Sequence, residues 1–301
     1  FPFYNCMRGL TISLLVGLLY ASASLAQQRK HYIIEDNHDF DHLDFTLNAT
    51  SGSYQISPTH NLNPINIYGN LPEGAREPEF TSRLDQRTNY VSFNLQEDQD
   101  QDISKTITFN VFSKNESEDK QWMVYLSQSK PLCLNLNYGI GDAMIDLSGV
   151  PIQKLKINTG SADVTVEYSG QANKVDMDTF YVKVDLGSVT VKRADFARAK
   201  IIIAEVGFGD LTLDFSKVTA IKSEVIASVG AGNLEILIPK TEAPIKIILN
   251  DSPLCRVKLA KSFEGVEENV YVNKSYLPDS ENLLTFNLDV AMGYIVFKEK
   301  K

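Results

Sequence analysis

One short phrase recurs along the chain with a period slightly above twenty residues, and this repeat limits the possible folds more than any other feature. Each copy has a small residue, a short polar residue, and then apolar and polar residues in alternation. The first apolar residues of five copies stand at positions 143, 164, 189, 211 and 234, so the steps are 21, 25, 22 and 23 residues. The five copies begin at Gly141, Ala162, Gly187, Gly209 and Gly232, and two further copies occupy 52–56 and 293–297.

The chemistry of the phrase favours a turn followed by a strand. Glycine reaches positive φ without a Cβ clash, and a short polar side chain can bond its own backbone two residues on. The alternation that follows has the two-residue period of a half-buried strand. A unit of this length cannot bury its own apolar face, but stacked units share one continuous core, which is the principle of a solenoid.

We therefore predict an all-β protein in which the copies stack as the rungs of a β-solenoid. A β-sandwich of hairpins is the alternative, but it would not require the same turn phrase at a near-constant step. Thr212 and Asp214 should face outward, and Gly209 should hold a conformation that disfavours a residue with a Cβ atom. The second apolar residue of each copy should face inward, in a ladder of Ile145, Val166, Val191, Leu213 and Ile236.

Residues 1–26 have the composition of a cleavable export signal. Arg8 precedes an apolar run from Leu10 to Tyr20, and small residues follow, which is the order of a basic region, an apolar region and a cleavage site. The apolar run is too short to span a membrane. We expect the first six residues to be an upstream extension of the reading frame. Cleavage before Gln27 would give an exported mature chain without a transmembrane segment.

The rest of the chain divides into two predicted regions, an N-terminal β region or cap at 27–130 and the solenoid at 131–301. In the first region, the polar stretch 27–44 should be solvated. The stretch 58–88 contains four prolines and should be a loop or the edge of the cap. Hairpins with polar tips are predicted from strands at Tyr90–Leu95, Ile103–Phe112 and Trp122–Leu126.

Charge and cysteine content limit the partners and the covalent structure. The formal net charge is −9 and the isoelectric point is about 5.0, which argues against nucleic acid or an anionic membrane as a partner. Cys133 and Cys255 remain after cleavage, and export would permit a disulfide. They lie at opposite ends of the array, however, and several rungs at about 4.8 Å each exceed the reach of a disulfide. We therefore expect no disulfide between Cys133 and Cys255.

Two patterns contain possible metal ligands. In the segment from His38 to His42, the two histidines would share a face of a strand or lie one turn apart on a helix, but a solvated segment is the better interpretation of this polar stretch. The Gly-x-Gly-Asp turns at 139–142 and 207–210 are similar to calcium-binding β-roll repeats, which need a tandem nonapeptide. Because the step here exceeds twenty residues and Ser188 and Asn233 replace the aspartate, we expect no metal site and no cofactor.

The sequence shows no signature of catalysis. A Ser-His-Asp set would need a histidine on the scaffold, and none occurs after His60. Sugar-cleaving enzymes use carboxylates instead, and several outward acidic residues could line a groove. Solvated acidic residues are nevertheless the usual occupants of outward strand positions, so we predict that the protein is not an enzyme and has no catalytic residues. The carboxylates considered are Asp146, Asp163, Glu167, Asp214 and Glu235.

Four phrases around the repeat carry a family resemblance, namely 134–142, 146–150, 155–160 and 206–210. From Leu134 to Ile238 the chain resembles the bacterial toast-rack family, which is related to the C-terminal domain of LiaF-type envelope-stress regulators and to adhesins with single-stranded β-helices. The resemblance implies a right-handed single-stranded β-helix and offers no catalytic residues. The leader predicted here differs from the several membrane spans of LiaF itself.

These observations favour a non-enzymatic, exported β-solenoid that offers a surface for protein or glycan contacts at the bacterial cell envelope, in an adhesin-like or structural role. The expected location is the periplasm, the cell surface or the extracellular space. An envelope-stress regulatory protein is one alternative, and a glycan-active enzyme is another. An enzyme would require clustered aromatic residues and two close carboxylates in one groove.

Overall fold

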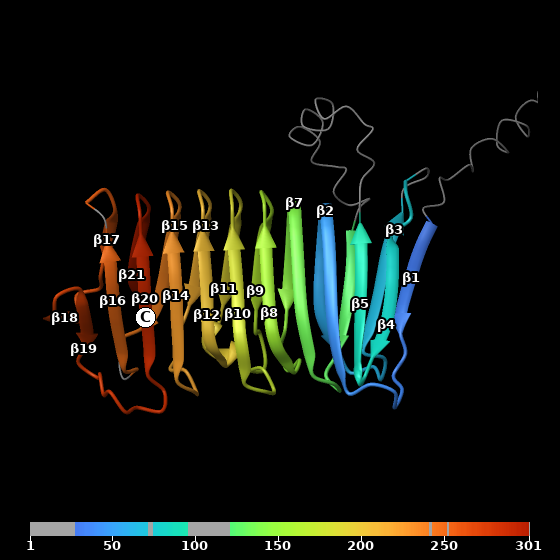
Figure 1. Ribbon diagram of the computed structural model, residues 1–301, viewed down its shortest axis with the longest axis horizontal. Coiled ribbons are helices and arrows are strands. Elements are labelled where there is room, and N and C mark those ends of the chain that lie inside the picture. Colours follow the sequence, from blue (N-terminus) through green and yellow to red (C-terminus); the bar gives the residue numbers. More distant parts are fainter. Residues whose placement is uncertain (1–27, 72–74, 96–120, 241–242, 252, 301) are drawn as a thin grey trace, which may run out of the picture.

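The strands form one elongated stack, with the N-terminal strands at one end and the C-terminal strands at the other (Figure 1). The one helical element among the described residues is a 3₁₀ turn at Ala194–Ala197, so none of their helices could cross a membrane. The predicted leader lies outside the described residues, and so does the predicted strand at 103–112. This computed structural model describes residues 28–71, 75–95, 121–240, 243–251 and 253–300.

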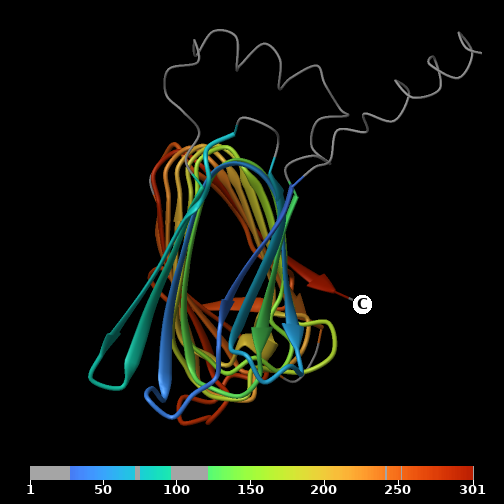
Figure 2. The same cartoon turned by 90° about the vertical axis from the view of Figure 1, so that its right-hand side faces the viewer.

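Each rung of the array contributes one strand to each of two parallel sheets, and the chain crosses between the sheets at the repeated phrase. Figure 2 views the stack end-on and shows the sheets as two walls joined along one edge. Neighbouring rungs pair in parallel, as the predicted β-helix requires, and this pairing excludes the hairpin sandwich for this array. The first sheet contains β8 (Ile152–Thr159), β10 (Met177–Val184), β12 (Ala199–Val206) and β14 (Ser223–Val229). The second contains β9 (Asp163–Glu167), β11 (Ser188–Lys192), β13 (Asp210–Asp214) and β15 (Asn233–Pro239).

The N-terminal end continues the same two sheets and then closes them with antiparallel strands. Two long strands, β2 (His42–Thr59) and β7 (Leu132–Asp146), each pass through both sheets and pair in parallel from Leu43 to Ile56. Further out, β5 and β6 pair in parallel with the two halves of β2. Antiparallel β4 covers β5, whereas β3 and then β1 cover β6. These outer strands are β1 (Gln28–Ile34), β3 (Ile65–Leu71), β4 (Glu79–Asp85), β5 (Thr88–Leu95) and β6 (Gln121–Ser127).

The predicted strands at 90–95 and 122–126 correspond to β5 and β6, which lie in different sheets and each pair with β2. Both predicted hairpins involve the strand at 103–112, so they lie outside the described residues. The stretch 58–88, predicted as a loop or the edge of the cap, contains the covering strands β3 and β4. The prediction that 27–44 is solvated is wrong in part, because this stretch contains β1 and the buried ring of Phe40. Pairing of β2 with β7 also joins the two predicted regions, whose boundary at residue 130 stays a prediction.

The C-terminal end has rungs that are out of chain order. Strands β20 and β21, the last of the chain, insert between the β14–β15 rung and the β16–β17 rung. The rung at the end of the stack therefore precedes, in the sequence, the rung that lies next to it on the inner side. Antiparallel β19 covers the edge of β16, and β18 pairs with β19. The strands are β16 (Ile245–Asp251), β17 (Arg256–Lys258), β18 (Phe263–Glu267), β19 (Val270–Asn273), β20 (Leu284–Val290) and β21 (Tyr294–Lys300).

The predicted inward ladder is confirmed. Its five side chains pair rung to rung in register, and each is at most 1% exposed. The early and late copies of the phrase extend the ladder, because Ile56 pairs with Ile145 and Phe297 pairs with Ile236. Equivalent strands thus place equivalent apolar side chains one above another, and one hydrophobic core runs from the first rung to the last.

The glycine at the corner between the sheets is required by close approach of the backbone. Gly209 is not among the described glycines with positive φ, so the predicted reason is wrong. A Cβ atom at Gly209 would lie 2.3 Å from the carbonyl oxygen of Gly187 on the rung before. Gly232 repeats this arrangement, with 2.2 Å to the carbonyl oxygen of Gly209. The corners stack so closely that a side chain has no room at this position.

Asp214 does not lie in solvent as predicted. Its carboxylate is buried, and two hydrogen bonds stabilise it there. Lys300 donates from Nζ to Oδ2 at 2.6 Å, and the Ser216 backbone N–H donates to Oδ1 at 2.8 Å. Burial by itself raises the pKa of Asp214, but the hydrogen bonds from Lys300 and Ser216 outweigh it and leave the pKa below its ordinary value. The last strand of the chain thereby ties itself to β13 through an ion pair.

Leu213→Ala should destabilise the fold by about 2–5 kcal/mol, because it opens a cavity in the middle of the ladder with rungs on both sides. Thr212→Ala changes the neighbouring outward side chain and should stay within about 0.5 kcal/mol of the parent. Urea melts of both variants measure the difference. A larger loss for Thr212→Ala would mean that the inward and outward faces of β13 are exchanged.

Gly209→Ala should lower the melting temperature, because the added Cβ atom would collide with the carbonyl oxygen of Gly187. Gly170→Ala is the matched control, since a Cβ atom at Gly170 would meet nothing within 4 Å. Thermal melts compare the two substitutions under the same conditions. Equal melting temperatures would show that the corner can spread apart without cost.

Asp214→Asn should cost about 1–3 kcal/mol at pH 7, because it removes the charge from hydrogen bonds made to a buried carboxylate. The folded pKa lies below the unfolded value, so the carboxylate stabilises the fold above pH about 4, and this contribution is lost as the pH falls further. Urea melts at pH 7 and pH 3 should therefore show a smaller difference between variant and parent at pH 3. The same difference at both pH values would contradict this linkage.

Candidate functional site

The five acidic residues considered for catalysis do not converge on one site. Asp146 and Glu167 are neighbours in register on the second sheet, and Asp163 begins the same strand as Glu167. Glu235 lies on the outward face of β15, further along the stack, and Asp214 is buried against Lys300. Asp146 and Glu167 line one open hollow of about 250 Å³ together with Asp142, whereas the other three candidates lie outside its lining.

Each of these carboxylates also accepts a hydrogen bond from a neighbouring side chain. Ser188 donates to Asp163 at 2.6 Å, Lys192 donates to Glu167 at 3.4 Å, and Lys298 donates to Glu235 at 2.6 Å. Burial raises the pKa of Asp146, but hydrogen bonds from Ser148 and Ser169 outweigh it, so the pKa of Asp146 is lowered. A general acid for glycoside cleavage needs a raised pKa. Asp146 and Asp214 have the opposite shift.

The carboxylates that follow the corner turns accept hydrogen bonds from short polar side chains on adjacent rungs. Ser53 donates to Asp142 at 2.8 Å, and Asn233 donates from Nδ2 to Asp210 at 2.6 Å. The Ser and Asn copies of the phrase are therefore hydrogen-bond donors to the Asp copies. Among the described residues, no group of three or more His, Cys, Asp or Glu side chains could hold a metal ion.

The histidine segment before β2 is anchored to the fold by its other residues. The Phe40 ring is buried, with the ammonium of Lys130 4.0 Å from the ring centroid, and Arg87 forms an ion pair with Asp41. His38 and His42 are exposed. The segment therefore has a structural role, because Phe40 and Asp41 connect the start of β2 to Lys130, which precedes β7, and to Arg87, which precedes β5.

The two cysteines are free and only partly buried. Cys133 lies between Asp44 and Lys154 in the outward row of the first sheet. Burial raises the pKa of the Cys133 thiol, and the charge of Asp44 raises it further. A thiol with a raised pKa is a poor nucleophile at neutral pH, so this position does not supply a reactive cysteine.

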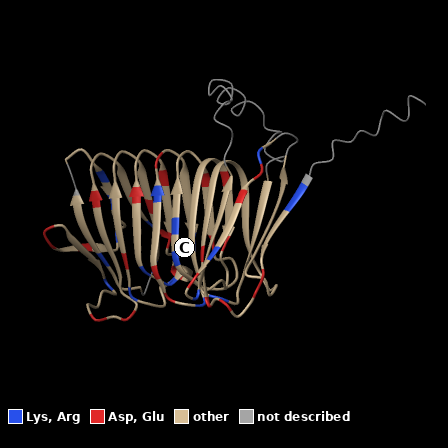
Figure 3. Cartoon of the chain, turned by 45° about the vertical axis from the view of Figure 1, so that its right-hand side comes forward, with Lys and Arg blue, Asp and Glu red and all other residues tan. Residues whose placement is uncertain are grey.

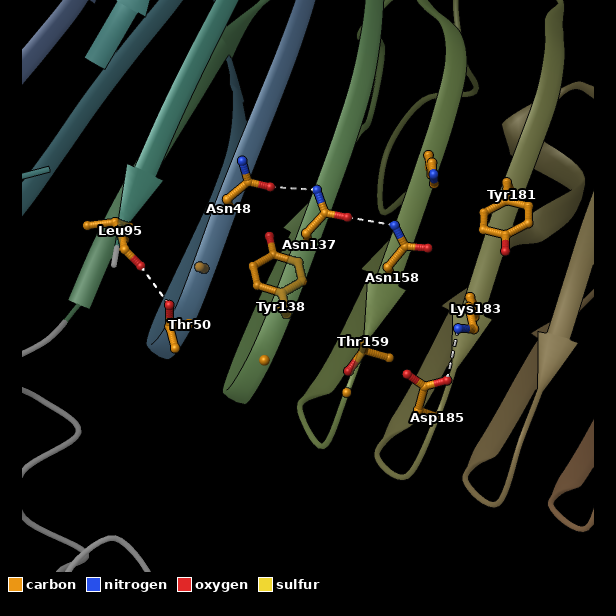
Figure 4. A pocket seen from close by; sticks show the side chains of 14 residues that line it. Asn48, Thr50, Leu95, Asn137, Tyr138, Asn158, Thr159, Tyr181, Lys183 and Asp185 are labelled. Atoms are coloured by element: carbon orange, nitrogen blue, oxygen red, sulfur yellow. Dashed lines mark hydrogen bonds and ion pairs between the residues drawn. The ribbon is translucent and has the colours of Figure 1, made fainter. Parts of the chain in front are cut away.

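A row of asparagine side chains on the first sheet is joined by hydrogen bonds from rung to rung (Figure 4). Asn158 donates to Asn137 at 2.6 Å, Asn137 donates to Asn48 at 2.8 Å, and Asn48 donates to Asn94 at 2.6 Å. Asn94 in turn donates to Glu79 of the covering strand at 3.2 Å. Every bond runs from Nδ2 to a side-chain oxygen in one direction, so neighbouring rungs fix the orientation of each amide.

This row lines an open groove of about 610 Å³, which we name the amide groove and define by Asn48, Asn137, Asn158, Lys156, Tyr181 and Lys183. Figure 4 shows the ring of Tyr181 beyond Asn158, on the next rung. The ammonium of Lys156 lies 5.4 Å from the centroid of this ring. Burial raises the pKa of Tyr181 to about 12, with a further contribution from a hydrogen bond to Glu205. Lys183 forms an ion pair with Asp185 at 3.3 Å.

The groove floor contains an unusual polar group. The hydroxyl of Tyr138 is buried and has no hydrogen-bond partner among the described residues. Its ring contacts Tyr54, with 5.4 Å between centroids. Burial raises the pKa of Tyr138, so this hydroxyl stays protonated at physiological pH. The groove therefore offers amides, one half-buried aromatic ring, ammonium groups and the carboxylate of Asp185, which is paired with Lys183.

A second polar surface lies at the N-terminal end of the second sheet. His31 stacks on Tyr68 with 4.2 Å between ring centroids, and Tyr125 meets Tyr68 edge-on at 5.8 Å. Asn70 and Gln121 line the same hollow. The sequence analysis missed this surface because it predicted the first stretch as solvated and the second as a loop or the edge of the cap. The alternation of apolar and polar residues at Ile65, Asn66 and Ile67 is the signal that could have revealed β3, whereas β1 has no such alternation.

Comparison with known proteins gives a family but no described function. No curated protein matches the chain. One similar solved structure, from Clostridium sporogenes ATCC 15579, is described as a "putative cell adhesion protein"; it is 16% identical, with a TM-score of 0.48, over 91% of this chain and 100% of that one. A "putative adhesin" from Bacteroides fragilis NCTC 9343 is 12% identical, with a TM-score of 0.39, over 91% of this chain and 98% of that one. Residues 23–192, more than half of the chain, match the family described as the N-terminal domain of toast_rack, DUF2154, and the chain therefore belongs to the toast-rack family.

Proposed function

We propose that this chain is an exported, non-enzymatic, adhesin-like protein of the bacterial cell envelope that binds a neutral glycan in the amide groove. The observation that carries the proposal is the hydrogen-bonded row of Asn158, Asn137 and Asn48 beside the ring of Tyr181. The groove is open to solvent along several rungs, which suits an extended ligand. A glycan is one of the two partner classes, protein or glycan, that the sequence analysis expects for the exposed face of the solenoid.

The chemistry of the row suits sugar hydroxyls. An asparagine side chain has two N–H donors and an oxygen with two acceptor sites. Asn137 uses both of its donors, to Asn48 and more weakly to Asn135 at 3.4 Å, and one acceptor site, to Asn158, so its second acceptor site is left for a sugar hydroxyl. Strands about 4.8 Å apart place the neighbouring amides of the row at a regular step along the groove. Tyr181 adds a flat apolar ring with a polar end, which is suited to a surface that is apolar on one side and wet on the other.

The state of the carboxylates supports binding in place of cleavage. Glycoside hydrolysis needs one protonated and one ionised carboxyl group on opposite sides of the bond. Asp146 has a lowered pKa and Glu167 is paired with Lys192. Both lie on the second sheet, whereas the amide groove lies on the first. A ligand in the groove would therefore not meet this pair.

Export is the part of the proposal that rests on the sequence of residues 1–26. The order of basic, apolar and small residues there is that of a cleavable signal. N-terminal sequencing of the protein from envelope fractions should begin at Gln27. A chain that starts earlier, or one found only in the cytoplasm, would contradict this part.

Asn158→Ala and Tyr181→Ala should each weaken glycan binding, with a loss of roughly fivefold for one hydrogen bond of about 1 kcal/mol. The measurement is binding of the mature chain to an array of neutral oligosaccharides, followed by titration of the best ligand. Thr190→Ala is the control, because Thr190 is an outward strand residue on the opposite sheet. Binding by the two groove variants that equals the parent would refute the groove, and release of shortened oligosaccharides would indicate the enzyme alternative.

A further inference from the structure

A line of large apolar side chains stands exposed along the corner between the two sheets. Ile140 is 54% exposed, Leu186 is 65%, Phe208 is 73% and Met292 is 60%. Soluble proteins rarely expose apolar residues in one continuous patch unless the patch makes a contact. We name these four residues the apolar ridge. The small residues Ser161 and Ala231 occupy the two rungs between them.

Backbone hydrogen bonds align the ridge residues on successive rungs. Leu186 donates its N–H to the carbonyl of Gly160, Phe208 donates to that of Asp185, and Met292 donates to that of Gly230, each at 2.8 Å. Every acceptor is the residue before the corner residue of the neighbouring rung. The corners repeat at one height along the upper edge of the stack in Figure 1. The side chains therefore form a fixed row on a rigid scaffold.

Glycine on one or both sides keeps the neighbouring surface low, so the ridge side chains project from it. Phe208 lies between Gly207 and Gly209, and Ile140 lies between Gly139 and Gly141. Five rung steps separate Ile140 from Met292, so the ridge is about 24 Å long at about 4.8 Å per step. A helix of about 16 residues has the same length at 1.5 Å per residue.

Acidic side chains border the ridge on both sides. On the second-sheet side, Asp142, Asp163 and Asp210 each follow a corner residue by two positions and are exposed. On the first-sheet side, Lys183 pairs with Asp185. Anionic lipid would be repelled by these carboxylates, and a second copy of the chain would bring the same charges. The exposed acidic residues on the first-sheet side are Asp185, Glu205 and Asp289.

We propose that the apolar ridge binds a basic amphipathic helix of a protein partner. The apolar stripe of such a helix would lie along Ile140, Leu186, Phe208 and Met292, and its lysine and arginine residues would reach the carboxylates on both sides. Helical turns repeat every 5.4 Å, close to the rung step of about 4.8 Å, so successive apolar anchors stay near successive ridge residues. Asp185 borders both the ridge and the amide groove, but the ridge residues themselves do not line the groove, so variants at Leu186 and Phe208 test this proposal apart from glycan binding.

The test uses an 18-residue helical peptide of leucine and lysine with one apolar face, labelled for fluorescence anisotropy. The full mature chain should bind it, and more weakly as salt is raised. Leu186→Ser combined with Phe208→Ser should lower the affinity at least tenfold. Asp163→Asn combined with Asp210→Asn should lower it several-fold and flatten the salt dependence. Leu62→Ser combined with Leu277→Ser is the matched control and should bind as the parent does, since both leucines are exposed but lie off the ridge.

Several results would overturn the proposal. Equal binding of a peptide with glutamate in place of every lysine refutes it, and so does equal binding of a scrambled peptide without an apolar face. Unchanged binding by the Leu186 and Phe208 double variant refutes it as well. Binding of the parent to phosphatidylcholine vesicles, lost in that double variant and without peptide binding, would assign the ridge to a lipid surface instead. Urea melts of all variants should match the parent, because every changed side chain is exposed.

Discussion

The fold depends on in-register parallel pairing between rungs. Because each strand pairs with the equivalent strand of the next rung, residues at equivalent positions of the phrase form columns along the stack. Each column then has one environment throughout. Apolar residues are required in the inward columns, since they share one core, and glycine is required where successive corners come within contact of each other's carbonyl oxygens. Outward columns carry no such requirement and can differ from rung to rung.

The two ends of the stack follow from the same pairing. A parallel stack leaves unpaired backbone groups at each end, where further strands or other chains could add. This chain covers those edges with antiparallel strands, β4 and β3 at one end and β19 at the other. It also inserts β20 and β21 beneath the rung that was formed earlier in the sequence. The last rung is therefore held on both sides, and the ion pair of Lys300 with Asp214 links it to the middle of the array.

The repeat made the solenoid predictable, and the parts outside the repeat were not. The inward ladder followed from the phrase alone, because period two fixes the face of every residue once one is known. Strands β1, β3 and β4 have no counterpart in the phrase and pair antiparallel with partners that the repeat does not specify. The burial of Asp214 depends on Lys300, which is 86 residues away, and no local pattern contains that information.

The candidate surfaces were in the sequence but outside the phrase as we defined it. Asn48, Asn137 and Asn158 each stand four residues before the start of a copy, and the ridge residues stand one residue before it. Extending the phrase backward by four residues would have predicted that the asparagines form one column and the ridge residues another, although not which side chains they contact. The same register explains how one corner can carry two different chemistries. The backbone fixes where the side chains of a column stand, so a change from Asn to Lys along one column, or from Ser to Phe along another, alters what the surface can bind without altering the core beneath it. Separation of inward and outward columns thus allows a solenoid to acquire a binding surface at little cost in stability.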